Sequence, residues 1–227
     1  MHLSRRVELI ELDSAALADA AEQDLAAAIP SCPGWTMADL VRHVLQVHRS
    51  WCRIVAEGRT EPDWSEAPMP PDAELVAEFR ANAARFAAVL GATDPEAPCW
   101  TWGPEQNAGF VQRFQVQEAA LHRWDAESAV GTPRPIAPDG AADAIALDNT
   151  LLADAARGAE AGFEVVTTDT PFGMTISASP DLPVVGSLRG TASDLLLVLW
   201  KRLPLRSVEV TGDAAAIAAA IAAIAID

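Results

Sequence analysis

Glu118 and His122 are the two residues in this sequence whose types and spacing best suit metal chemistry. They stand four residues apart in VQEAALHRWDAE (116–127). On a helix they would lie one turn apart and about 40° apart around the axis, so both side chains could reach one ion. The same side of that helix carries apolar residues: Val111, Phe114 and Leu121. We therefore expect the pair to face a packed interior, where a carboxylate is costly unless it is paired or bound to a metal.

A zinc site needs at least a third protein ligand, and the other histidines are His2, His43 and His48. His2 lies at the end of the chain, where we expect fraying. His43 and His48 are about 140° apart on one helix, so they cannot easily share an ion. Periodicity slightly favours His48 as the inward residue, with His43 at the edge of the apolar arc. The residues alone also leave open a His48 packed in the core and a Glu118–His122 pair without any metal.

Asp125 falls on the same helical face, three residues after His122. From that position its carboxylate could accept a hydrogen bond from a ligand imidazole and orient the ring.

Three arginines could bind a substrate carboxylate, but the sequence does not choose among them: Arg80, Arg85 and Arg113.

The cysteines are Cys32, Cys52 and Cys99, an odd number without a CxxC pair. This usage disfavours a disulfide framework and fits a reducing compartment. A helix N-terminus could lower the pKa of the Cys32 thiol, but no histidine lies near it in sequence to activate it.

Trp100 and Trp102 are interpreted as packing residues. The sequence contains no GxSxG, HExxH or glycine-rich phosphate loop.

Composition narrows the classes of partner. The chain has 227 residues, half of them hydrophobic, and 32 acidic against 16 basic side chains give a formal charge of −16. Such a surface repels phosphate backbones and anionic lipid, so we expect neither a nucleic-acid nor a membrane partner. The first 20 residues are interrupted by acids and do not read as a signal peptide, and the longest strongly apolar run, 195–200, is too short to span a bilayer. A cytoplasmic location is expected.

The elements that must position the ligands are predicted to be four helices. Periodicity places them at 5–28, 36–57, 72–90 and 108–129. Thr36 and Asp39 form a capping box at the start of the second helix, and Gly58 and Gly91 are expected to end the second and third. A proline-rich connector, 59–71, joins the second helix to the third.

The pattern changes after TPRPIAPDG (132–140), which has the composition of a domain linker. Beyond it, helices are predicted at 141–158, 191–202 and 213–225, and strands at 163–168, 171–177, 184–190 and 207–212. We therefore expect a mainly α protein: an all-α bundle over residues 1–131 and a smaller α+β domain over residues 141–227.

Three stretches together resemble one known family. PSCPGWTMADLVRHVLQVHRSW (30–51), EAALHRWDAESAVG (118–131) and RGTASDLLLVLWKRLPLRSVEVTGD (189–213) are similar, in this order, to segments of the mycothiol-dependent maleylpyruvate isomerases, which belong to the DinB-like metal-binding four-helix bundles. The resemblance spans nearly the whole chain. It implies a DinB-like four-helix bundle in which His43, Glu118 and His122 hold a divalent metal ion. Zinc is the expected ion, and nickel and iron are the alternatives. The resemblance thereby overrides the angular preference for His48.

The resemblance also implies an activity. A low-molecular-weight thiol, mycothiol in members of that family, would bind at the open metal position and attack a small electrophile. Addition to a double bond gives cis–trans isomerisation, and displacement of a leaving group gives S-transfer. Two other classes stay open: a metal-binding or regulatory bundle without turnover, and a metal-dependent hydrolase in which water is the nucleophile. Neither the substrate nor the oligomeric state follows from the sequence.

Overall fold

The computed structural model describes residues 1–64, 68–155 and 159–223, with the side chains of 149–155 left out. Within it the chain divides into two compact units, Met1–Pro135 and Ile136–Asp227. Parts of three predictions lie outside the described residues: the end of the helix expected at 141–158, the end of the one expected at 213–225, and positions 65–67 of the connector.

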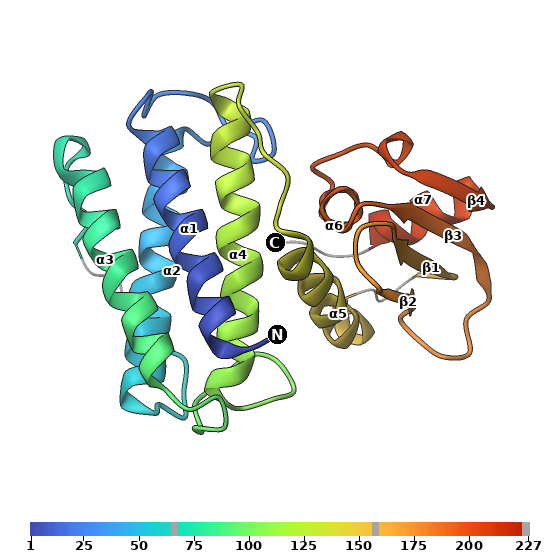
Figure 1. Ribbon diagram of the computed structural model, residues 1–227, viewed down its shortest axis with the longest axis horizontal. Helices are drawn as coiled ribbons and strands as arrows, with labels where there is room; N and C mark the ends of the chain where they lie inside the picture. The colour runs from blue at the N-terminus through green and yellow to red at the C-terminus, as the bar shows by residue number, and fades with distance from the viewer. Residues whose placement is uncertain (65–67, 156–158, 224–227) are drawn as a thin grey trace. The chain divides into compact units, whose positions relative to one another are not determined.

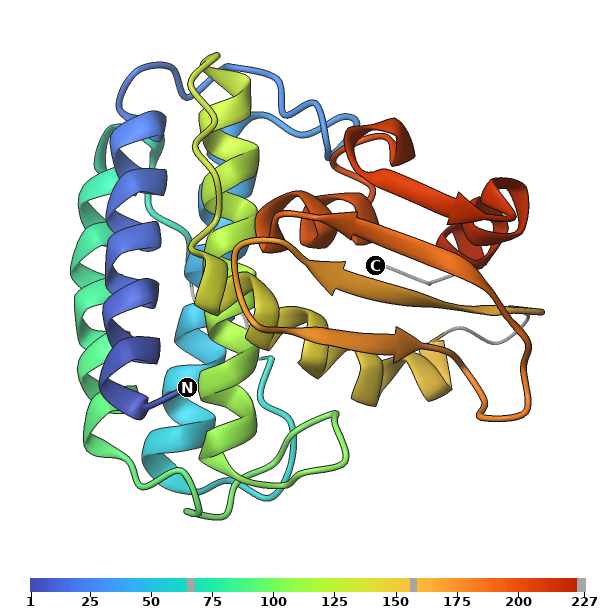
Figure 2. The ribbon, with the colours of Figure 1, turned by 45° about the vertical axis from the view of Figure 1, so that its right-hand side comes forward.

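The first unit is a bundle of four long helices (Figures 1 and 2). They are α1 (Leu3–Ala21), α2 (Met37–Glu57), α3 (Asp72–Ala92) and α4 (Ala108–Ala129). Helix α1 packs against α3 and α4, and α2 packs against the same two helices. Every helix therefore has two main neighbours, and the predicted all-α bundle is confirmed.

Local sequence explains where α2 and α4 begin. The Thr36 hydroxyl accepts a hydrogen bond from the Asp39 backbone N–H, and the Asp39 carboxylate accepts one from the Thr36 backbone N–H, which is the predicted capping box. Helix α2 ends at Gly58, whose φ of 59° is left-handed. The Asn107 side chain caps α4 by accepting from the Phe110 N–H. These caps fix the ends of both helices that carry the predicted ligands.

Two predicted helix ends in the bundle are wrong, and in the second unit the helix predicted at 191–202 ends at Leu199. Helix α1 stops at Ala21 instead of residue 28, because the Asp24 carboxylate accepts a hydrogen bond from the Ala26 N–H in a turn. The carbonyls of Leu25 and Ala27 then accept from the first backbone N–H groups of α2. Helix α3 continues through Gly91 to Ala92, so packing outweighs the low helix propensity of glycine there.

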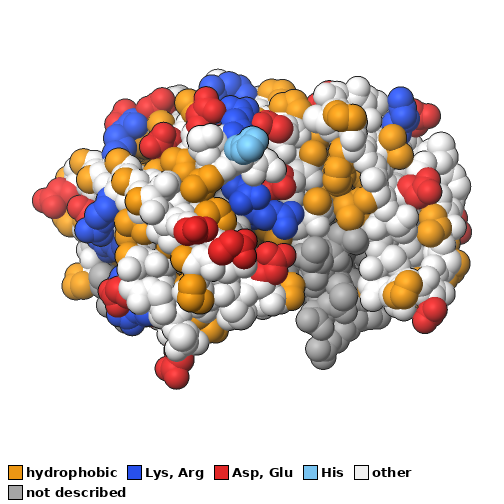
Figure 3. All heavy atoms as spheres, turned by 60° about the horizontal axis from the view of Figure 1, so that its bottom comes forward, with side chains coloured by type: hydrophobic (Ala, Val, Ile, Leu, Met, Phe, Trp, Pro, Cys, Tyr) orange, Lys and Arg blue, Asp and Glu red, His pale blue; other side chains and the backbone are white. Residues whose placement is uncertain are grey.

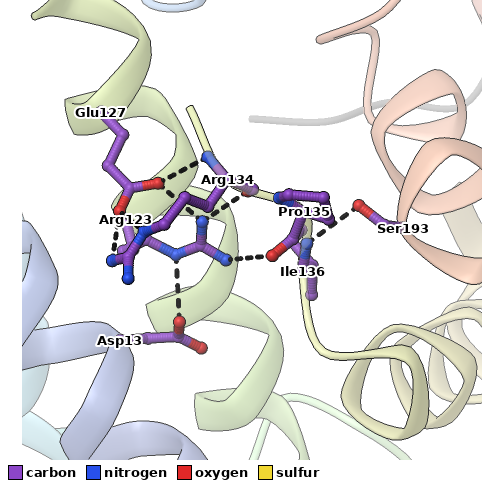
Figure 4. A network of polar contacts seen from close by, with 7 residues as sticks. All are labelled: Asp13, Arg123, Glu127, Arg134, Pro135, Ile136 and Ser193. Atoms are coloured by element: carbon purple, nitrogen blue, oxygen red, sulfur yellow. Dashed lines mark hydrogen bonds and ion pairs between the residues drawn. The ribbon is translucent and has the colours of Figure 1, made fainter. Parts of the chain in front are cut away.

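A buried ionic network closes the first unit at its C-terminal end (Figure 4). The Arg123 guanidinium, whose side chain is 4% exposed, donates to Asp13 at 3.0 Å and to Glu127 at 2.8 Å. It also donates to the carbonyls of Arg134 and Pro135, and the Arg134 guanidinium donates to Glu127. Burial raises the pKa of Asp13, with Arg123 opposing. The segment after α4 is thus held against α4 and α1.

The second unit has helices packed on a small sheet. Helix α5 (Pro138–Ala155) precedes β1 (Gly162–Thr167), β2 (Gly173–Ile176), β3 (Val184–Gly190), α6 (Ala192–Leu199), a short 3₁₀ turn (Leu205–Ser207), β4 (Glu209–Gly212) and α7 (Ala214–Ala223). The strand order is β2-β1-β3-β4, parallel between β1 and β3 and antiparallel at both edges. Helices α6 and α7 contact both central strands. The predicted α+β fold of this part is confirmed.

The network suggests where the first domain ends, and this gives a prediction. We propose that residues 1–135 fold alone, whereas a fragment ending at residue 131 loses the carbonyls and the guanidinium that satisfy Arg123 and Glu127. Hydrogen bonds to charged groups contribute about 1.5–3 kcal/mol each, so the shorter fragment should melt roughly 5 °C or more below the longer one. Circular dichroism melting of both fragments is the measurement. If the longer fragment is unfolded under native conditions, the two units form one cooperative structure.

The distribution of charge on the surface and the composition of the helices bear on the expected absence of nucleic-acid and membrane partners. On the face drawn in Figure 3, basic side chains are interspersed with acidic and hydrophobic ones. Among the described helices, none is both long enough and apolar enough to cross a membrane.

Candidate metal centre

Helices α2 and α4 bring His43, Glu118 and His122 together. The Nε2 atoms of both imidazoles approach the same oxygen, Glu118 Oε1, at 3.2 Å for His43 and 3.3 Å for His122. One ligand atom of each residue lies within 4.8 Å of the others. The imidazole rings of His43 and His122 are 5.1 Å apart between centroids. Over the part of the chain that the structure describes, this is the one group of histidine, cysteine and carboxylate side chains close enough to share an ion.

The donor set fits zinc. Two imidazole nitrogens and a carboxylate oxygen are common zinc ligands, bound at about 2.0–2.2 Å. In a tetrahedral site such ligand atoms lie about 3.3 Å from one another, since bonds of about 2.05 Å meet at the tetrahedral angle. The two Nε2–Oε1 separations of 3.2 and 3.3 Å match that spacing. Three protein ligands leave one coordination position for another molecule, as in catalytic zinc sites.

When no metal is bound, Glu118 and His122 of this group form an ion pair. Burial disfavours the charged form of Glu118, but the charge of His122 and hydrogen bonds from both imidazoles outweigh it, so the pKa of Glu118 is held well below its usual range. Burial also disfavours protonated His122, but the Glu118 charge and the Asp125 hydrogen bond raise the pKa of His122 to about 9. A metal ion must therefore displace a proton from His122.

Asp125 supports His122 from the other side of the ring. Its carboxylate, fully buried, accepts from His122 Nδ1 at 3.0 Å, which leaves Nε2 facing Glu118. The Ser31 hydroxyl donates to the second oxygen of the same carboxylate at 2.5 Å. This carboxylate–histidine arrangement fixes the ring orientation, as is usual around protein-bound zinc. The predicted supporting position of Asp125 agrees with this geometry.

The centre is accessible from the His43 side. The side chain of His43 is 38% exposed, whereas those of Glu118 and His122 are 14% and 11% exposed. The ring of Trp35 packs against His43 with centroids 5.2 Å apart. The exposed part of His43 therefore leaves this edge of the group open to solvent, whereas Asp125, beside the His122 ring, is fully buried.

His48 is buried in the core, which is one of the possibilities that the sequence left open. Its ring packs against Phe79 and Phe86, with centroids 5.7 and 4.7 Å away. Neither of its nitrogens has a hydrogen-bond partner among the residues that the structure describes, and burial lowers the pKa of His48 to about 4. His48 points inward, as periodicity predicts, but its ring does not belong to the group that could hold a metal.

The remaining candidates lie apart from this group. Cys52 and Cys99 are buried, and burial raises the pKa of both thiols, so neither is activated. Arg80 makes ion pairs with Asp19 and Glu22 on the surface. Trp100 stacks on Trp51, and Trp102 packs edge-on against Phe110 and Phe114, which agrees with packing roles.

Ser31 and Trp35 were not predicted as site residues. Both belong to the PSCPGWT loop (30–36), whose family resemblance pointed to the start of α2 and not to contacts with the ligands. The partner of Ser31, Asp125, is distant in sequence. The contact of Trp35 with His43 is a packing of rings that helical periodicity does not predict.

The ionised pair predicts a pH dependence of metal affinity. Because the pKa of His122 in the fold is about 9, above its usual 6.5, the ion pair stabilises the metal-free protein fully below pH 6.5, and that contribution is lost as the pH rises through 9. Zinc competes with the proton, so its apparent affinity should rise about tenfold per pH unit between pH 7 and 9. Calorimetric titrations in two buffers of different ionisation enthalpy should count about one proton released at pH 7.5. A flat affinity without proton release would contradict the ion pair.

The chain is similar to known proteins in sequence and in fold. A family model described as the Mycothiol maleylpyruvate isomerase N-terminal domain matches residues 9–127, which is 119 of the 227 residues. A crystal structure of the mycothiol-dependent maleylpyruvate isomerase superposes with a TM-score of 0.71 at 17% identity, covering 94% of this chain and 95% of that one. A crystal structure of a histidine-to-alanine mutant of the mycothiol-dependent maleylpyruvate isomerase gives the same values. No curated protein matches the sequence significantly.

Proposed function

This chain belongs to the mycothiol maleylpyruvate isomerase family, and from that premise we propose that it is a metal-dependent enzyme that uses a low-molecular-weight thiol. Family membership, with a fold shared over 94% of the chain, confirms the expectation of an enzyme. The metal, the thiol and the reaction are our proposal. The resident metal would be zinc, with nickel or iron as alternatives, and the thiol would be mycothiol.

The observation that carries the proposal is the three-ligand group with one side open. His43, Glu118 and His122 would hold the ion, and the two imidazoles add no charge to it while the carboxylate adds one negative charge. Zinc held by these residues would lower the pKa of a bound thiol and so supply a thiolate beside the electrophile. Asp125 would keep His122 in the tautomer that presents Nε2. The exposed edge of His43 gives the thiol and the electrophile access.

Two reactions fit this arrangement. In the first, the thiolate adds to an activated double bond, the new single bond rotates, and elimination returns the thiol and the isomerised alkene. In the second, the thiolate displaces a leaving group and stays bonded to the product. In both, the chain's own residues supply ligation and positioning, and the thiol supplies the nucleophile.

The experiment that tests the proposal is a titration of mycothiol into the cobalt-loaded protein. Cobalt replaces zinc as a spectroscopic probe, and we expect a new sulfur-to-cobalt absorption band that saturates at one thiol per site. A serine analogue of the thiol serves as the control and should give no such band. Binding without the sulfur band would favour the hydrolase or the non-enzymatic metal-binding alternative.

A further inference from the structure

The loop that connects α1 to α2 contacts one imidazole of the candidate metal centre directly and contacts the residue that supports the other. At one end of the loop, the Ser31 hydroxyl donates to the Asp125 carboxylate, which in turn accepts from His122. At the other end, the Trp35 ring lies 5.2 Å from the His43 ring. One segment of seven residues, 30–36, therefore lies beside ligands from two different helices.

The loop is stiff enough to hold these two contacts at a fixed separation. Backbone hydrogen bonds join Ile29 N–H to the Trp35 carbonyl at 3.0 Å and Trp35 N–H to the Cys32 carbonyl at 3.0 Å. Two prolines, Pro30 and Pro33, restrict φ within the same turn. The loop thus closes on itself just before Thr36 caps α2.

We propose that the 30–36 loop positions the two ligand imidazoles relative to each other, with Ser31 acting through Asp125 on His122 and Trp35 acting directly on the His43 ring. The inference rests on the proposed function, because it assumes that these imidazoles bind a metal. It assigns Ser31 and Trp35 as positioning residues, which act through Asp125 and through the His43 ring and supply no ligand atom themselves. The loop is therefore a part of the metal centre.

Gly34 allows the loop to be tested through its backbone. Its φ is +89°, a left-handed conformation that side-chain-bearing residues rarely adopt. Apart from its two chain neighbours, a Cβ added there would meet no atom of the described residues within 4 Å, so alanine would mainly strain the backbone of the loop. Gly131 is a matched control after the end of α4, with φ +79° and similarly open surroundings among the described residues.

The main experiment compares zinc affinities of Gly34→Ala and Gly131→Ala in the full-length protein, measured by competition with a chromophoric chelator. Both substitutions should lower the melting temperature of the metal-free protein by similar amounts, because the backbone strain is alike. Only Gly34→Ala should weaken zinc binding, by roughly tenfold or more, as is typical when an outer partner of a ligand is disturbed. Equal zinc affinities of the two variants would overturn the proposal.

Single side-chain variants separate the two ends of the loop. Ser31→Ala and Trp35→Leu should each weaken zinc binding by roughly 10- to 100-fold. The conservative variants Ser31→Thr and Trp35→Phe should restore most of it, because a hydroxyl and a ring are returned. A purely structural role would instead lower the melting temperature without changing zinc affinity, and that result would also overturn the inference.

A second readout does not depend on metal at all. In the metal-free protein, nuclear magnetic resonance of the ring protons should show that Trp35→Leu changes the environment of His43 and that Ser31→Ala changes that of His122. If the unmodified protein does not bind zinc, the proposed function fails while this readout can still show the loop contacts. If it binds zinc and both loop variants bind equally well, the loop inference fails and the proposed function stands.

Discussion

His122→Ala is expected to leave the purified protein with far less than one metal ion per chain. The substitution removes one of three ligands, leaves the buried Asp125 carboxylate without its imidazole partner, and leaves Glu118 with His43 alone. Loss of a direct ligand should exceed the roughly 10- to 100-fold drop in affinity that follows loss of an outer partner. His43→Ala and Glu118→Ala should have the same effect, because each supplies one of the atoms in the group.

His48→Ala is the matched control for this series. It also removes a histidine from α2, but one whose ring packs between Phe79 and Phe86. Truncation of a buried ring costs about 3–5 kcal/mol in comparable cores, so this variant should melt at a lower temperature yet keep its metal. Elemental analysis and thermal melting of the four variants give the two readouts. Full metal retention in His122→Ala would disprove the proposed metal site. Nickel or iron in place of zinc would leave the ligands as proposed and change only the identity of the ion.

The contrast between His43 and His48 shows what helical periodicity can and cannot predict. Spacing placed Glu118 and His122 on one interior face because both belong to one helix, and local geometry settles that. It also placed His48 inward, which the structure bears out. Periodicity does not report which residues of other helices each turn of α2 meets, so it could not tell which of the two histidines lies beside Glu118 and His122. The resemblance to a family supplied the choice of His43.

Local sequence predicted element starts better than it predicted contacts. The Thr36–Asp39 capping box and the Gly58 cap depend on neighbours within four residues, and both are present. The hydrogen bond between Ser31 and Asp125 spans 94 positions, and nothing near Ser31 indicates its partner. The early end of α1 combines a local turn at Asp24 with hydrogen bonds from the start of α2 to the carbonyls of Leu25 and Ala27, and helical periodicity indicates neither. Contacts that join distant segments are set by packing of the whole bundle.

A variant without any cysteine is expected to keep the thiol-dependent reaction. The structure places Cys52 and Cys99 in buried positions where burial raises the pKa of each thiol, so neither forms a thiolate readily. Cys32 is partly buried in the loop before α2. None of the three belongs to the group that could hold a metal. The proposed nucleophile therefore remains an external thiol, since a soft thiolate would suit a zinc ion held by His43, Glu118 and His122.

The experiment replaces Cys32, Cys52 and Cys99 together with serine and measures conjugation or isomerisation of an activated alkene in the presence of mycothiol. The variant should keep its metal and a rate within a fewfold of the unmodified enzyme, and omission of mycothiol should abolish the reaction in both. Serine puts a hydroxyl into two buried sites, so a second variant with alanine at Cys52 and Cys99 controls for folding. Circular dichroism confirms that each variant is folded before rates are compared. A full rate without added thiol would indicate a hydrolase-type mechanism with water as the nucleophile, and loss of the reaction in a folded cysteine-free variant would assign the nucleophile to the chain itself.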